Sequence, residues 1–138
     1  MSAGIATEET MDRRLALKIA LVVTGLLFLA LIYPTALFMR REPALSMMLS
    51  LYVTLGIFLL MATRNPTAHR SIILFTAWSS FAHALVMGYQ TLLGMVARAE
   101  LVGVAVLVVI GVVLLILLPG KESAARLPAQ PLPIANRS

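Results

Sequence analysis

The sequence of 138 residues contains no cysteine. Without thiols the chain cannot form a disulfide, a thiolate zinc site or an iron–sulfur cluster. It contains only two histidines, and His69 falls in a predicted loop, which leaves His83 without an intramembrane partner for a bis-histidine haem site. We therefore expect no cofactor and no metal.

Charged residues are also scarce, at 12% of the chain against 60% hydrophobic residues. The mean hydropathy is +0.95, which is too apolar for the surface of a soluble domain. Eleven Lys and Arg outnumber six Asp and Glu, but no basic stripe interleaved with aromatics is present. We expect these cations to meet membrane lipids, and we expect no nucleic-acid partner.

Long uncharged runs separate the charged clusters and predict membrane-spanning helices. The first run, residues 19–39, would be about 30 Å long as a helix, which is the thickness of a bilayer core. The predicted spans are residues 19–39, 43–63, 71–97 and 101–118. The sequence thus predicts an all-α membrane protein, a four-transmembrane-helix bundle with short loops within residues 19–120.

Prolines mark the expected ends and bends of these spans. Pro43 suits the first turn of the second span, where its missing N–H is not needed. Asn65 and Pro66 are typical of a helix N-cap followed by proline, so we expect the third helix to start there. Tyr33-Pro34 predicts a bend near the end of the first span.

The segments outside the bundle determine the predicted orientation. Residues 1–18 form a cytoplasmic N-terminal segment, and residues 121–138, with three prolines among small and polar residues, form a disordered cytoplasmic tail. With the N-terminus inside, eight Lys and Arg lie on the cytoplasmic side and three on the other. This bias predicts that both termini are cytoplasmic.

The third span is the most polar of the four. Thr76, Ser79, His83 and Gln90 recur at helical spacing and, with Gly94, form one stripe that should avoid lipid. On the second span a similar line, which we expect to face this stripe, consists of Ser46, Ser50 and Thr54.

A second stripe on the third span consists of Ser80, Ala84 and Gly88. Small residues four positions apart let another helix backbone come close. This pattern predicts a helix-packing face, on which a bulky replacement of Gly88 would destabilise the bundle or its oligomer.

His83 is the one ionisable side chain deep within a predicted span. As a functional group it would be a proton relay or a ligand contact, since intramembrane ionisable groups are functional candidates by default. As a structural group it would be an interhelical hydrogen-bond partner. We favour the structural interpretation because no carboxylate lies in any span.

Residues 45–90 resemble a family of small four-helix bacterial membrane proteins catalogued as a domain of unknown function. The most specific segments are MMLSLYVTLGIFLL, NPTAHRS and AWSSFAHA. The resemblance implies the four-helix fold and a bacterial inner (plasma) membrane, and it implies no catalytic residue. By contrast, residues 19–39 lack the embedded Glu of small multidrug resistance transporters.

No nucleophile–base–acid set and no metal cluster can be assembled from the sequence, so we expect no enzymatic activity. The leading hypothesis is a non-enzymatic accessory or partner-binding bundle, either as a homo-oligomer or with an unidentified membrane-protein partner. The alternative is a small transporter or channel for protons or a small solute that uses the stripe of His83 and Gln90.

Overall fold

The computed structural model describes the backbone of residues 2–118 and the side chains from residue 10 onward. The predicted tail, residues 121–138, lies outside the described residues. The elements are α1 (Ser2–Ala30), α2 (Ile32–Phe38), α3 (Pro43–Ala62), α4 (Arg70–Leu92), the short 3₁₀ helix η1 (Arg98–Glu100) and α5 (Leu101–Leu117). Within the described residues there is no strand, and the predicted all-α fold class is confirmed.

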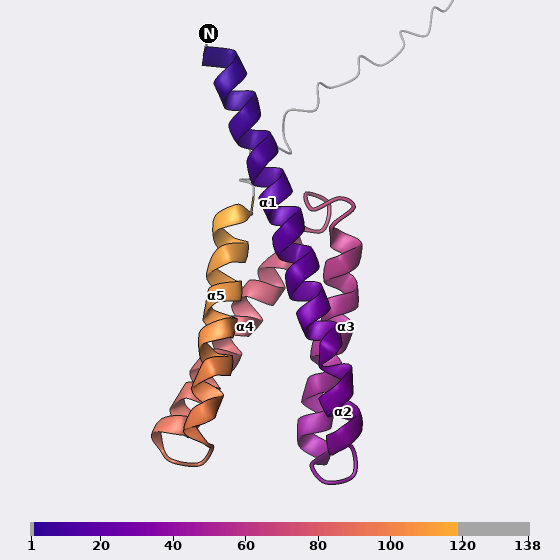
Figure 1. The fold of residues 1–138 in the computed structure, drawn as a ribbon, viewed down its shortest axis with the longest axis vertical. Coiled ribbons are helices and arrows are strands. Elements are labelled where there is room, and N and C mark those ends of the chain that lie inside the picture. Colours follow the sequence, from indigo (N-terminus) through magenta and orange to yellow (C-terminus); the bar gives the residue numbers. More distant parts are fainter. Residues whose placement is uncertain (1, 119–138) are drawn as a thin grey trace, which may run out of the picture.

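Four segments are long and apolar enough to cross a membrane: Thr10–Phe38, Pro43–Ala62, Arg70–Leu92 and Arg98–Leu117. They form a ring in which α1 contacts α3 and α5, and α4 contacts α3 and α5 (Figure 1). The closest packing is within two hairpins, α1 with α3 and α4 with α5. Toward the end opposite the N-terminus the two hairpins diverge (Figure 1).

The first span is broken where the sequence predicts a bend. α1 ends at Ala30 and α2 begins at Ile32, because Pro34 has no N–H to donate to the carbonyl of Ala30. The Thr35 backbone N–H and side-chain hydroxyl both donate to Leu31 O, at 3.0 and 2.7 Å. These bonds continue the helix on the far side of the break.

The third helix begins later and ends earlier than predicted. Asn65 Oδ1 accepts from Thr67 Oγ1 at 2.7 Å and Ala68 N at 3.3 Å, so Asn65 caps an isolated turn, and α4 begins only at Arg70. The prediction that Asn65 caps the third helix was therefore wrong. α4 ends at Leu92 rather than at residue 97, because Gly94 has φ +69°, a left-handed conformation that ends a helix.

Glycines allow the two hairpins to pack closely. A Cβ atom on Gly25 would lie 2.9 Å from Leu60 side-chain carbons and 3.1 Å from Gly56 O, so the backbones of α1 and α3 touch at this crossing. In the other hairpin, a Cβ atom on Gly111 would lie 2.7 Å from the ring of Phe81. Around these crossings lies a core whose buried members include Leu17, Leu21, Phe28, Leu59, Ile73, Ala77 and Leu114.

Arg13 connects the first and last helices at the N-terminal end of the bundle. Its Nη2 donates to the carbonyl oxygens of Ile116 and Leu118 at the C-terminal end of α5. The last carbonyls of a helix have no partner within the helix, and a cation there is also favoured by the helix dipole. Arg13 thus caps α5 from α1.

Candidate functional site

A groove of about 850 Å³ lies between α3 and α4. Large apolar side chains form most of its lining: Met48, Leu51, Leu55 and Phe58 from α3, and Ile72, Phe75 and Val86 from α4, with Ala82 also on α4. Five polar residues complete the lining: Tyr52, Thr54, Ser71, Ser79 and His83. Of the polar residues that we expected to face each other from the second and third spans, Thr54, Ser79 and His83 line the groove.

The groove follows from the way the two hairpins are joined. α3 and α4 lie close together at the loop that connects them, and they separate with increasing distance from that loop (Figure 1). The lining positions extend from Ser71 to Val86 on α4, a rise of about 22 Å. A groove of this length runs along most of a bilayer core, which is about 30 Å thick.

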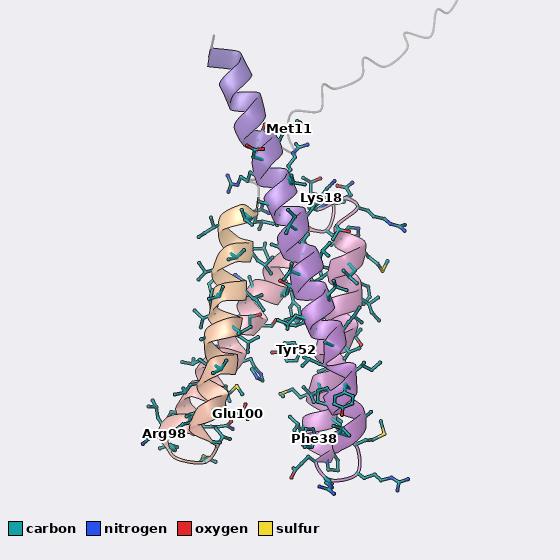
Figure 2. The ribbon with its side chains drawn as sticks, viewed as in Figure 1. Met11, Lys18, Phe38, Tyr52, Arg98 and Glu100 are labelled. Carbon is teal, nitrogen blue, oxygen red and sulfur yellow. The ribbon has the colours of Figure 1, made fainter. Side chains whose placement is uncertain are left out.

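Three aromatic rings from three helices meet beside the groove. The ring centroids of Phe28 and Tyr52 are 5.0 Å apart, and those of Tyr52 and His83 are 5.4 Å apart, both edge to face. Phe28, from α1, is only 2% exposed. Because edge-to-face contacts fix the ring orientation, the Tyr52 side chain is held between its neighbours. Tyr52 lies at about mid-height of the bundle, between the hairpins (Figure 2).

The hydroxyls in the groove mostly bond to their own helices. Thr54 Oγ1 donates to Ser50 O at 3.0 Å, and Ser79 Oγ donates to Thr76 O at 3.1 Å. By contrast, the Tyr52 hydroxyl and the His83 ring nitrogens have no hydrogen-bond partner within residues 10–118. They are therefore the available hydrogen-bonding groups at the middle of the groove.

The other residues of the predicted polar stripe on the third span, and of the polar line on the second span, do not line the groove. Thr76 is fully buried, with its hydroxyl donating to Ile72 O at 2.9 Å. Gln90 does not line the groove, and Gly94 lies beyond the end of α4. Ser46 is buried and donates to Glu42 O at 3.0 Å, while Ser50 is exposed and donates to Met47 O at 2.6 Å.

The predicted packing face of Ser80, Ala84 and Gly88 is closely packed at its first two residues and open at the third. Ser80 and Ala84 are 0% and 4% exposed, respectively. A Cβ atom on Gly88, however, would meet no atom of the described residues within 4 Å, so no backbone in residues 2–118 approaches closely there. The close glycine contacts are instead at Gly25, Gly56 and Gly111, which sequence spacing did not single out.

The described side chains offer little for metal binding. Among them, no group of three His, Asp or Glu residues is placed to hold a metal ion. Tyr52 was the site residue that the helical spacing missed, because it belongs to neither polar stripe. Its one sequence signal was the phenol itself, near the middle of the second span.

Residues 12–130 match the family described as "Family of unknown function (DUF6632)". No curated protein and no solved structure matches the chain significantly. The family match covers most of the chain and agrees with the resemblance of residues 45–90, and the helical structure fits a small four-helix membrane protein. The chain therefore belongs to the family of unknown function DUF6632.

Proposed function

We propose that the chain is a non-enzymatic, partner-binding accessory protein of the bacterial inner membrane, and that the groove between α3 and α4 is its binding surface. One observation supports the proposal above all others: the groove itself, with its volume of about 850 Å³ and its mostly apolar lining. Binding sites between the helices of a bundle have this size and this mixture of many apolar and few polar groups.

The packing of the hairpins explains why this surface is available. Glycines allow close packing within each hairpin, at Gly25 and Gly56 in the first and Gly111 in the second. The contact between α3 and α4 is less extensive than the contacts within the hairpins. The facing sides of α3 and α4 thus retain unfilled surface, and a partner that covers it would gain apolar contacts.

The chemistry of the groove supports binding rather than catalysis. His83 is its one ionisable group near neutral pH, and no carboxylate lines the groove. A relay or a hydrolytic set would need a second acid or base within hydrogen-bond reach of His83. We therefore propose no enzymatic activity, and membrane lipids cover the remaining apolar faces.

The distribution of cations supports an orientation with both termini in the cytoplasm. At the N-terminal end of the bundle the described cations are Arg13, Arg14, Lys18, Arg64 and Arg70, and at the opposite end they are Arg40, Arg41 and Arg98. Figure 2 places Lys18 at the first end and Arg98 with Glu100 at the other. Lys and Arg concentrate on the cytoplasmic side of membrane proteins.

Site-specific crosslinking in native membranes tests the proposal. A photoreactive amino acid at Val86, which lines the groove, should yield one discrete protein adduct. The matched control is Leu85, its neighbour on α4, which is 76% exposed but does not line the groove. The control should yield lipid adducts only.

The mass of the adduct identifies the partner, because a second copy of the chain and a different membrane protein give adducts of different mass. Lipid adducts alone at both positions would contradict the proposal. Equal protein adducts at both positions would also contradict it, because the binding would then not be specific to the groove.

A further inference from the structure

We propose that Tyr52 and His83 together recognise a hydrogen-bonding side chain, of the amide type, at the middle of a partner's transmembrane helix. This inference rests on the proposed function, since it names the partner's chemistry in the same groove. The supporting juxtaposition is a phenol from α3 and an imidazole from α4, with ring centroids 5.4 Å apart in a largely apolar groove.

Depth favours a partner helix over a lipid. Tyr52 lies nine residues after the start of α3 and ten before its end, which is about 14 and 15 Å from each. At this depth a phospholipid offers only hydrocarbon, because its polar atoms lie at the interface. A polar group that is left unpaired in hydrocarbon has an unfavourable free energy. A side chain at the centre of a transmembrane helix reaches this depth and removes that penalty.

The hydrogen-bonding groups on the two rings specify the chemistry of that side chain. The Tyr52 hydroxyl both donates and accepts, and a neutral imidazole has one donor and one acceptor nitrogen. None of these groups bonds elsewhere in the described part of the chain. A carboxamide supplies an acceptor oxygen and a donor nitrogen side by side, so it pairs with both rings at once.

The rings are fixed before a partner arrives. Tyr52 is held edge to face between Phe28 and His83, and Phe28 is buried against the core. Fixed side chains lose little conformational entropy on binding. In addition, Ser79 and Ala82 line the groove on α4 and are small, which lets a helix backbone approach.

Two designed transmembrane peptides provide the test. Both are leucine- and alanine-rich and identical except at the central residue, which is Gln in one and Leu in the other. The full chain, labelled at Ala68→Cys in the exposed loop, is reconstituted with each peptide in phosphatidylcholine vesicles, and binding is followed by energy transfer. The absence of native cysteine makes this label unique. Self-association of each peptide is measured separately and subtracted.

The wild-type chain should bind the Gln peptide about 3- to 30-fold more tightly than the Leu peptide, as expected for interhelical hydrogen bonds in membranes. The double variant Tyr52→Phe/His83→Phe keeps both rings and removes the hydrogen-bonding groups. In this variant the difference between peptides should disappear. Tyr89→Phe, which removes the same hydroxyl from an exposed position outside the groove, should leave the difference intact.

Two outcomes would overturn the inference: equal or absent binding of the two peptides by the wild-type chain, or a preference for Gln that survives in the double variant. The first does not depend on any variant folding correctly. A protein adduct at Val86 without any Gln preference would refute this inference and leave the proposed function standing. Lipid adducts alone at Val86 would refute the proposed function as well.

Discussion

The backbone oxygen of Gly25 lies 2.8 Å from the position that a Cβ atom would occupy on Gly56. Real Cβ atoms essentially never come this close to another atom, so α1 and α3 can cross here only because Gly56 has no side chain. The contact is between two backbones, which cannot yield as a flexible side chain can. This contact fixes the distance between α1 and α3, the helices that carry Phe28 and Tyr52.

Gly56→Leu should therefore destabilise the protein. Overpacking at a tight contact typically costs about 1–3 kcal/mol, and here the neighbouring group is backbone. Thermal unfolding in mild detergent measures the loss. Gly88→Leu is the matched control, since no atom of the described residues lies within 4 Å of its Cβ position, and it should unfold as the wild type does. The reverse ranking of the two variants would show that α4, rather than α1 and α3, makes the critical close approach.

Arg13→Gln should loosen the C-terminal end of α5. The substitution removes the charged donor to Ile116 and Leu118 carbonyls. Because Arg13 is exposed, we expect a loss of only about 0.5–1 kcal/mol. Hydrogen exchange at the last turn of α5 should become faster. Arg14→Gln, at a neighbouring cation that is also exposed, should leave this exchange unchanged. Similar acceleration in both variants would mean that overall charge, not capping, protects the turn.

His83→Phe should keep nearly all of the stability, because it preserves the edge-to-face contact with Tyr52. His83→Leu and His83→Asn lose that contact, and each should cost about 0.5–1.5 kcal/mol. Thermal unfolding of the three variants in one detergent gives the comparison. Loss of stability in His83→Phe equal to that in His83→Leu would mean that a ring nitrogen, rather than the ring, is the stabilising group.

The same position tests the transport hypothesis. Under an imposed pH gradient, liposomes that contain the wild-type chain should show no more proton flux than empty liposomes. The reason is that, apart from His83, the groove is lined by no side chain that titrates near neutral pH. Flux through the wild type that is absent from a folded His83→Asn variant would establish a proton relay, since an amide does not titrate in this range.

Reporter fusions test the orientation. A reporter that is active only in the periplasm should work when fused after Arg41 or near Arg98, and it should fail after Arg70 or at the C-terminus. The reason is that the cations concentrate at the end of the bundle that holds Lys18, Arg64 and Arg70. Activity of the reporter at the C-terminus would contradict the four-span topology with both termini inside.

The fold was largely predictable because each span is a local feature of the sequence. The uncharged runs, Pro43 at the start of α3 and Pro34 at the break after α1 act through the backbone and hydropathy of neighbouring residues. The errors were at the two ends of α4: Asn65 and Pro66 precede its start without forming its N-cap, and apolar residues continue past Leu92. The left-handed conformation of Gly94 determines the C-terminal end, and the side-chain hydrogen bonds of Asn65 form a separate turn before the N-terminal end.

The candidate site was predictable only in part. Helical spacing grouped Ser79 with His83, and both line the groove. It also grouped Thr76 and Gln90 with them, although Thr76 is buried and Gln90 lies outside the groove. A stripe is a property of one straight helix, whereas the groove depends on where the neighbouring helix lies.

The sequence alone determined that the chain is helical, has four segments long and apolar enough to cross a membrane, and has no cysteine chemistry, because these properties follow from composition and from runs of adjacent residues. Only the tertiary structure decided which glycines touch, that α3 and α4 diverge, and that Tyr52 meets His83. The physical reason is that lipid accepts any apolar face. Hydrophobicity inserts each helix without specifying its neighbours, and helix pairing then depends on close packing, which a linear pattern does not encode.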